Sequence, residues 1–412
     1  MKIRYRTRGR SISFGVVGYA VALFLFLLFS QTGYSIFSRF IAWIIFVGGT
    51  FPMLQFMSKK SQHIPVIELI LLAYVNAFSL PFFFQSRHVL LVKTLYPESE
   101  PVTFCLLLVL LAICALWVGY KIAPYILRGI NPPKLNLYCD DRKLLYYGAL
   151  LCFLSLGASL ITFGSLQGLI NIIASQDLGV ALFSFLYYKG LLGRKERIFV
   201  TAVIAVLVIH GIATSMTQAM LQPLMIWFIC RWLVTRKLEL KYIIVGAVLF
   251  VLIQPVKLEY RIAWGSDVQF STIQRVGLFS SLFYRYWFAS DDGGSIVEST
   301  YSRTSLLLQT AHVIDWTPTF VPYRDGETLK FMFVTWIPRF IWPGKPVAQQ
   351  ANIDYAVDYG VTTLEGTKTT MFGVGHLGEV FMNFGAMGVL PVYLLLGILS
   401  YIPLYFLVAS KS

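Results

Sequence analysis

Two cations four residues apart stand in the segment Lys257-Leu-Glu-Tyr-Arg261. If this segment is helical, Lys257 and Arg261 share one face and Glu259 points elsewhere. A guanidinium offers a planar fork of donors and an ammonium a point charge, a combination that suits a diphosphate. The alternative is that both side chains only anchor the end of an apolar helix at a membrane surface, and the spacing alone favours this alternative.

A proline-rich run, Trp336-Ile-Pro-Arg-Phe-Ile-Trp-Pro-Gly-Lys-Pro346, holds two more cations. Its three prolines prevent a regular helix and restrict the directions of Arg339 and Lys345. The rings of Trp336 and Trp342 suit a membrane interface or the face of a sugar ring. An aromatic turn that re-enters the membrane is the alternative, but such a turn does not need a cation between prolines, so we favour a functional role.

A glycine-rich segment, residues 373–388, places His376 and Glu379 three residues apart and therefore on one helical face. A charged side chain costs about 2.5–3.5 kcal/mol at the centre of a membrane span and less towards its ends, so ionisable groups there are functional candidates. His376 is a candidate proton carrier or phosphate contact, and Glu379 a candidate base or hydroxyl ligand. A closely packed helix start, in which both make structural hydrogen bonds, is an equal alternative.

Five weaker candidates lie in the same part of the chain, and for most of them a solvated loop with an Asp-Gly turn is the favoured interpretation. The chain has five cysteines but no CxxC motif, no HExxH motif and no paired histidines, so we expect neither a metal site nor a cofactor. The weaker candidates are His312, Asp315, Arg324, Asp325 and Glu327.

The composition indicates that the elements holding these residues are apolar helices. Of the 412 residues, 57% are hydrophobic and only 13% are charged, and the mean hydropathy is +0.68. Soluble domains carry roughly 25% charged residues. A secreted soluble enzyme, a disordered chain and a nucleic-acid-binding module are therefore poor fits, and a membrane-embedded protein is favoured.

Apolar stretches of about 20 residues predict an all-α polytopic membrane protein with about ten transmembrane helices, and nine to eleven are compatible with the soft boundaries. The sixth is the weakest, because it contains Lys189. The predicted spans cover residues 12–30, 40–57, 64–84, 102–120, 145–163, 174–192, 198–214, 216–230, 242–256 and 386–408.

The basic residues indicate the orientation of these spans. With a cytoplasmic N-terminus, the segments predicted on the inner side hold 20 of the 34 Lys and Arg residues, and the short outer loops hold only Arg39, Arg87 and Lys93. An excess of basic residues in short cytoplasmic loops is the positive-inside rule. The net charge of +14 therefore follows from topology, and no nucleic-acid partner is expected.

Residues 257–385 form a long segment without a clean span, predicted on the outer side. The segment carries 10 basic residues and 12 of the 20 acidic ones, which is typical of a small domain or a loop that caps a membrane cavity. Its apolar patches at 276–288 and 329–342 predict interfacial or re-entrant helices. The predicted organisation is a bundle of about nine spans at 1–256, this loop with the candidate site at 257–385, and a last helix with a cytoplasmic tail at 386–412.

Three stretches resemble the O-antigen polymerase (Wzy-type) or oligosaccharide repeat unit polymerase family: 256–261, the Pro-Arg-x2-Trp-Pro-x-Lys-Pro run at 338–346, and 378–385 followed by Gly388. The resemblance implies a multi-pass protein of the bacterial inner (cytoplasmic) membrane, with both termini cytoplasmic and the large loop periplasmic. Such proteins join undecaprenyl-diphosphate-linked glycans into O-antigen, capsule or exopolysaccharide, and a chain-length regulator protein and a flippase are the implied partners. Here a single span follows the large loop, whereas the family usually has more.

The implied reaction is a metal-independent glycosyl transfer, in which a sugar hydroxyl attacks an anomeric carbon and the lipid diphosphate leaves. The expected catalytic residues are Arg339, His376 and Glu379, with Glu379 or His376 accepting the hydroxyl proton. A ligase that transfers finished polymer to a lipid acceptor, and a transporter or flippase of lipid-linked glycans, remain alternatives. The expected diphosphate ligands are Lys257, Arg261, Arg339 and, more weakly, Lys345.

Overall fold

The computed structural model describes residues 10–29, 34–58, 65–83, 100–130, 140–160, 175–213, 217–235, 240–264, 272–289, 305–331, 337, 341–347, 349–368 and 372–409. All regular secondary structure in these ranges is helical. The chain divides into two compact units, which are described separately. Unit 1 comprises residues 1–134, 301–331 and 349–412, and unit 2 comprises residues 135–300 and 332–348.

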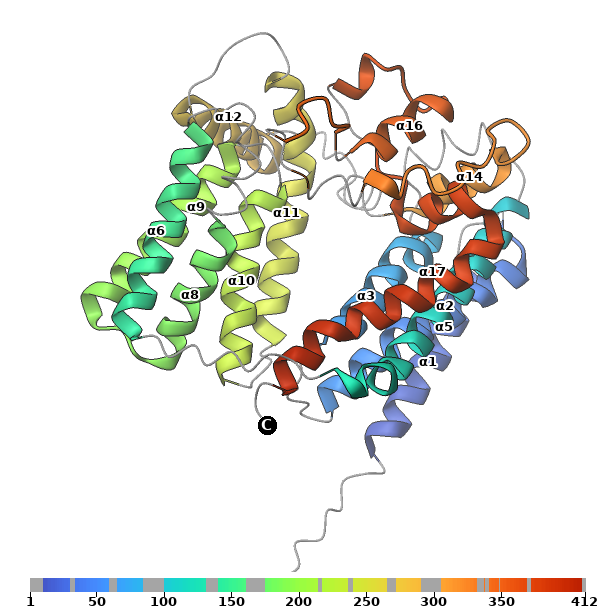
Figure 1. Cartoon of the computed structure of the whole chain (residues 1–412), viewed down its shortest axis with the longest axis horizontal. Helices are drawn as coiled ribbons and strands as arrows, with labels where there is room; N and C mark the ends of the chain where they lie inside the picture. The colour runs from blue at the N-terminus through green and yellow to red at the C-terminus, as the bar shows by residue number, and fades with distance from the viewer. Residues whose placement is uncertain are drawn as a thin grey trace, which may run out of the picture. The chain divides into compact units, whose positions relative to one another are not determined.

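Unit 1 contains the long apolar helices at the start of the chain and the final one, together with short helices between them (Figure 1). A π-turn and a 3-10 turn continue α3, and a 3-10 turn continues α5. Its helices are α1 (Arg10–Phe29), α2 (Ile36–Ser58), α3 (Val66–Tyr74), η1 (Val75–Ser79), η2 (Leu80–Phe83), α5 (Glu100–Ile126), η3 (Leu127–Gly129), α14 (Leu307–Trp316), α16 (Gln350–Asp358), η6 (Gly366–Lys368) and α17 (Gly375–Ala409).

The core of unit 1 is built on the contact between α5 and α17, which run side by side (Figure 1). A Cβ atom added to Gly119 would lie 2.1 Å from the carbonyl oxygen of Leu394, and one added to Gly397 would lie 2.2 Å from that of Leu116. Only glycine permits this approach of two backbones, which is the small-residue packing common between helices in membranes.

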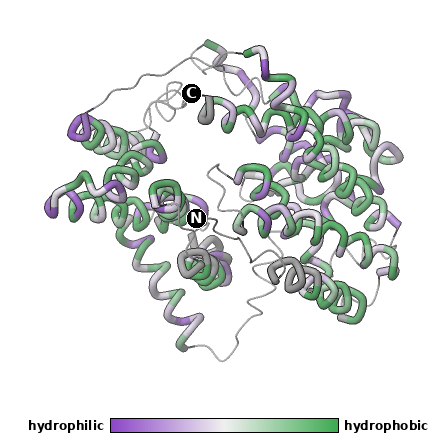
Figure 2. Tube along the Cα trace, turned by 90° about the horizontal axis from the view of Figure 1, so that it is seen from below, coloured by the Kyte–Doolittle hydropathy of each residue, from purple (hydrophilic) through white to green (hydrophobic). Residues whose placement is uncertain are grey.

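Hydrophobic residues are frequent along these helices, as the green of the tube in Figure 2 shows, and some of them face outward. Phe51, Leu111 and Leu395 are large, apolar and exposed. A helix that is hydrophobic on all sides fits a lipid environment. Within the described part of the chain, three helices are long and apolar enough to cross a membrane: Ile36–Met57, Glu100–Gly129 and Gly375–Phe406.

Unit 2 is a bundle of shorter helices in which α8 packs against both α6 and α10. Gly179 of α8 permits close contact with α6, because a Cβ there would lie 2.9 Å from the carbonyl oxygen of Gly148. α8 begins at Ser175, whose hydroxyl accepts a hydrogen bond from Leu178 N–H, and ends at Gly190 with a φ of 74°. The helices are α6 (Asp141–Leu160), α8 (Gln176–Lys189), α9 (Arg194–Ala213), α10 (Thr217–Thr235), α11 (Leu240–Trp264), α12 (Thr272–Tyr284) and the π-turn η5 (Arg285–Ala289).

The described residues in each of the ten predicted ranges are largely helical, so the all-helical class is confirmed, while the number of spans stays a prediction. The last helix begins at Gly375, well before the predicted 386, because its first turns carry polar residues that an apolar-run criterion rejects. α12 and η5 cover the first apolar patch, at 276–288. Most of the second patch, 329–342, lies outside the described residues; within it, Lys330 and Phe331 are helical and 341–342 are not. The predicted loop 257–385 is divided between the two units.

Candidate functional site

A break in α17 forms the base of the candidate site. Gly385 has a φ of 61° and a ψ of −159°, a conformation that only glycine adopts readily. The break leaves helical carbonyl groups that need other donors. The backbone N–H of Arg324 donates to the carbonyl of Met382 at 2.9 Å, and that of Asp325 donates to the carbonyl of Asn383 at 3.1 Å. The loop that contains Arg324 and Asp325 is therefore fixed to the break in α17.

A tight turn follows in this loop. Asp325 and Gly326 both have positive φ, 48° and 87°, and the N–H of Glu327 donates to the carbonyl of Arg324 at 2.8 Å. Asp and Gly are the residues that tolerate this backbone conformation. The turn brings Thr328 back onto α17, where its side chain is almost completely buried.

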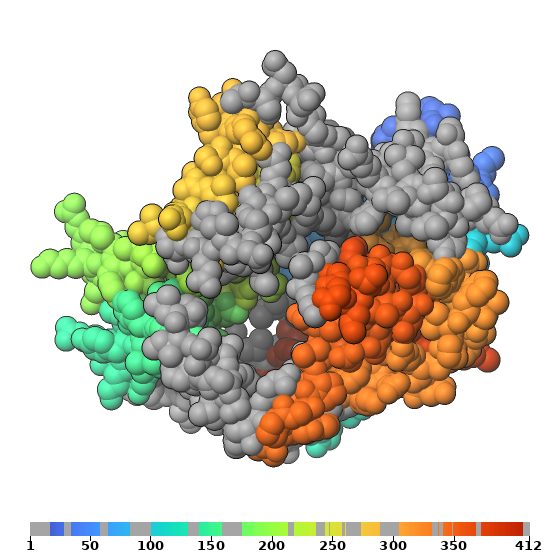
Figure 3. Space-filling model, turned by 90° about the horizontal axis from the view of Figure 1, so that it is seen from above, coloured from blue at the N-terminus to red at the C-terminus, as the bar shows by residue number. Residues whose placement is uncertain are grey.

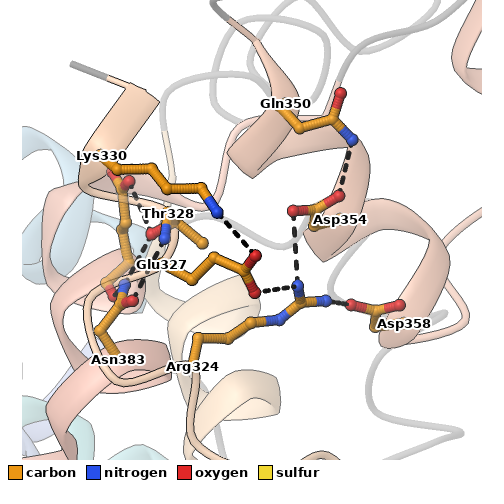
Figure 4. A network of polar contacts seen from close by, with 9 residues as sticks. Arg324, Glu327, Thr328, Lys330, Gln350, Asp354, Asp358 and Asn383 are labelled. Carbon is orange, nitrogen blue, oxygen red and sulfur yellow. Dashed lines mark hydrogen bonds and ion pairs between the residues drawn. The ribbon is translucent and has the colours of Figure 1, made fainter. Parts of the chain in front are cut away.

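Thr328 joins two residues of α17 in a chain of hydrogen bonds (Figure 4). Its hydroxyl donates to Glu379 Oε1 at 3.0 Å and accepts from Asn383 Nδ2 at 2.6 Å. Asn383 Nδ2 also donates to the carbonyl of Glu379 at 2.8 Å, and Asn383 Oδ1 accepts from Thr328 N–H at 3.4 Å. Asn383 is fully buried, whereas Glu379 as a residue is only partly buried, and its carboxylate is held in place by Thr328.

Arg324 lies beside this chain and is surrounded by carboxylates (Figure 4). It forms ion pairs with Asp358 and, at 3.5 and 3.6 Å, with Asp354 and Glu327. Gln350 donates a further hydrogen bond to Asp354 at 2.8 Å. The network ties the loop to α16, and with three acidic partners the guanidinium is already neutralised.

The exposed edge of the network is a pair between Glu327 and Lys330. Lys330 Nζ lies 2.8 Å from Glu327 Oε1. The Lys330 ammonium, and Arg324 to a smaller extent, lower the pKa of Glu327. Both side chains are about half exposed, so this pair adds little to stability.

An aromatic cluster supports the network from α14. His312 packs edge-on against Trp316 and Tyr359, with ring centroids 4.8 and 5.9 Å away. Burial lowers the pKa of His312 to about 4, so the ring is neutral at neutral pH. Burial also raises the pKa of Tyr359, whose hydroxyl forms a 2.5 Å hydrogen bond with that of Thr317. His312 is therefore a core residue in this structure.

Figure 3 shows residues 305–331 and 349–368, in orange, gathered in one continuous area. Of the predicted site residues, His376 and Glu379 belong to unit 1, where they lie in the first turns of α17. Glu379 contacts the loop as described, whereas His376 is exposed.

The predicted diphosphate ligands all belong to unit 2. Lys257 and Arg261 both lie in α11, as their spacing predicts; Lys257 is partly buried, and the side chain of Arg261 lies outside the described part. Lys345 Nζ donates to the carbonyl of Ile337 at 2.7 Å. Arg339 lies outside the described residues. Whether these cations share one ligand stays a prediction.

Four contributors to the site are missing from the sequence-based set: Thr328, Asn383, Asp354 and Asp358. Asn383 follows Glu379 by four residues, so helical spacing could have found it, and the same spacing relates Asp354 to Asp358. Nothing local marks Thr328, because its partners are about 50 residues away in the sequence. Arg324 and Glu327, for which a solvated loop is favoured by sequence, are instead part of a docked loop.

Within the described ranges, no group of three or more His, Cys, Asp or Glu residues is arranged to hold a metal ion. The arrangement offers a fixed carboxylate that can accept a proton from a hydroxyl group, next to an acidic rim with planar hydrogen-bonding side chains. Comparison with models of protein families, with curated proteins and with solved structures finds no match for this chain.

Proposed function

We propose that this chain is a membrane glycosyltransferase that polymerises undecaprenyl-diphosphate-linked oligosaccharide repeat units at the periplasmic face of the bacterial inner membrane. The observation that carries the proposal is the position of Glu379. The residue is partly exposed, its carboxylate is held by Thr328, and it lies in the first turns of a helix apolar enough to cross a membrane. A base at a membrane surface is what a lipid-linked sugar acceptor requires.

The chemistry needs few groups. A hydroxyl of one repeat unit attacks the anomeric carbon of the chain on the other lipid; the bond to the lipid diphosphate breaks, and the hydroxyl proton passes to Glu379, with His376 as the alternative acceptor. Cations must stabilise the charge that develops on the leaving diphosphate. We assign this role to Lys257, Arg261 and Arg339, with Lys345 as a weaker ligand.

The proposed topology has about ten spans, cytoplasmic termini and residues 257–385 in the periplasm. Helices at all ten predicted ranges are compatible with it, and the distribution of basic residues supports the orientation.

The test is a deletion of the gene in the organism that carries it, complemented by variants at matched protein level, with surface polysaccharide resolved on a gel. We expect a ladder that collapses to single repeat units in the deletion, in Arg339→Ala and in Glu379→Gln. Glu365→Gln, an exposed carboxylate of the same unit, is the matched control and should keep the ladder.

Other polysaccharide phenotypes of the deletion strain would identify a ligase or a flippase instead. Polymer of full length that stays on its carrier lipid would indicate a ligase, and repeat units that accumulate on the cytoplasmic side would indicate a flippase. A full-length ladder in Arg339→Ala at normal protein level would contradict the assigned role of Arg339.

A further inference from the structure

We propose that Thr328 and Asn383 are positioning residues that hold the carboxylate of Glu379 against the hydroxyl of the acceptor sugar. The proposal rests on the proposed function, and it assigns this part of the site to one of the two substrates, the acceptor sugar. Thr328 and Asn383 need not touch substrate themselves, because both act through Glu379.

The directions of the hydrogen bonds follow from the chemistry of the groups. Asn383 Nδ2 faces two acceptors, the Thr328 hydroxyl and the carbonyl of Glu379, while Asn383 Oδ1 faces the N–H of Thr328. A flipped amide would place oxygen against the carbonyl and nitrogen against the N–H. The amide therefore donates to Thr328, and the single hydroxyl proton of Thr328 is left for Glu379 Oε1.

The hydrogen bonds from Asn383 to Thr328 and from Thr328 to Glu379 determine which oxygen of the Glu379 carboxylate already accepts a hydrogen bond. Oε1 of Glu379 accepts from Thr328, and no hydrogen bond to Oε2 is found among the described residues. With Oε1 held by the Thr328 hydroxyl, Oε2 is the oxygen left to accept a proton from a substrate hydroxyl.

The frame that carries Thr328 is itself fixed. Backbone hydrogen bonds from Arg324 and Asp325 hold the loop to the break in α17, and the positive φ angles of Asp325 and Gly326 define the turn. Glu379 and Asn383 lie on the helical part just before the break. The distance between Thr328 and Glu379 is therefore determined by the backbone and not by a flexible side chain alone.

The charge around Glu379 favours the acceptor as its substrate. Glu327, Asp354 and Asp358 face only the cations of Arg324 and Lys330 in this network, so with Glu379 the carboxylates are in excess. Such surroundings repel a diphosphate and accommodate an uncharged hydroxyl group. The predicted cations for the diphosphate belong to unit 2.

The test uses purified full-length protein and, as substrate, undecaprenyl-diphosphate-linked repeat units extracted from the deletion strain. Thr328→Val keeps the shape and removes the donor, so we expect kcat to fall about 10-fold to 100-fold with KM nearly unchanged. Thr328→Ser should restore most of kcat. Thr310→Val is the matched control: Thr310 is equally buried, its hydroxyl has no hydrogen-bond partner among the described residues, and the kinetics should not change.

A double variant distinguishes a positioning role of Thr328 from a purely structural one. In a Glu379→Gln background, Thr328→Val should cause no further loss of kcat, because both changes remove the same interaction. If Thr328→Val does not fold, Thr328→Ala takes its place in both comparisons.

The outcomes separate this proposal from the function on which it rests. Suppose that the wild type polymerises but Thr328→Val keeps its kcat, or that the kcat losses of Thr328→Val and Glu379→Gln multiply in the double variant. In either case the positioning role is wrong, while the proposed polymerase activity stands. If the wild-type protein forms no polymer from these substrates, the proposed function fails and the positioning role fails with it.

Discussion

The role of a charged residue in this protein depends on neighbours that are distant in the sequence. Arg324 stands in a loop and, considered alone, could bind an anion. Asp354 and Asp358 lie about 30 residues further along the chain and neutralise it. Glu379 could be chosen as a candidate from sequence because its type and its place beside an apolar run are local properties. Its partner Thr328 could not, because only the folded loop brings the two together.

His312 makes the stability of unit 1 depend on pH. Burial lowers its pKa from 6.5 to about 4, so between these values the unfolded chain binds a proton that the folded chain does not. The unfolding free energy is therefore highest above about pH 6.5 and falls as the pH is lowered towards 4, by on the order of 3 kcal/mol in total.

His312→Phe should flatten this dependence, because phenylalanine keeps the contacts with Trp316 and Tyr359 and takes up no proton. The measurement is unfolding in detergent, followed by tryptophan fluorescence at several pH values between 4 and 7. A slope of the same size in His312→Phe would show that other groups cause it.

At the scale of elements, apolar length predicts where a helix lies but not where it breaks. The run after residue 386 marks α17 as a span, yet the helix starts earlier and has non-helical geometry at Gly385. Glycine is also frequent in regular membrane helices, so its presence alone does not identify a break. What distinguishes Gly385 is the loop residue Tyr323 packed against it, a long-range contact.

Gly385→Ala should destabilise the protein by at least about 2 kcal/mol, since the backbone conformation disfavours any side chain and the new Cβ would lie 2.8 Å from the hydroxyl of Tyr323. Thermal unfolding in detergent measures the effect. Gly373→Ala is the control, because a Cβ there meets no atom within 4 Å. Equal stability of both variants would contradict the described break.

Arg324→Ala should loosen α16 from the loop. Three carboxylates would lose their shared partner, and because Arg324 is 23% exposed we expect a loss of about 1–2 kcal/mol. Faster hydrogen exchange in α16 is the expected signature. Lys330→Ala removes a cation from the exposed pair and should leave exchange in α16 unchanged; faster exchange there would mean that net charge, and not the ion pairs of Arg324, holds the helix.

At the scale of the whole molecule, composition and periodicity are sufficient for the class of the fold. Mean hydropathy and apolar runs predict an all-helical membrane protein with helices at the observed places. They do not predict that residues 1–134 share a unit with the last helix, because the contacts of Gly119 and Gly397 join opposite ends of the chain.

The membrane topology can be tested by reporter fusions. Fusions after Lys134 and Lys237 should report the cytoplasm, and a fusion after Glu365 should report the periplasm, because basic loops stay inside. Extraction with alkaline carbonate should leave the protein in the membrane fraction. A cytoplasmic signal from the fusion after Glu365 would contradict both the topology and a periplasmic polymerase.

The glycine contact between α5 and α17 also constrains how the protein is made. α5 leaves the ribosome early, while the helix that packs on Gly119 is translated after all of unit 2. Until then, Gly119 lacks the backbone of Leu394 that packs against it in the finished structure. The contact between α5 and α17 can therefore form only at the end of synthesis, so the core of unit 1 is completed last.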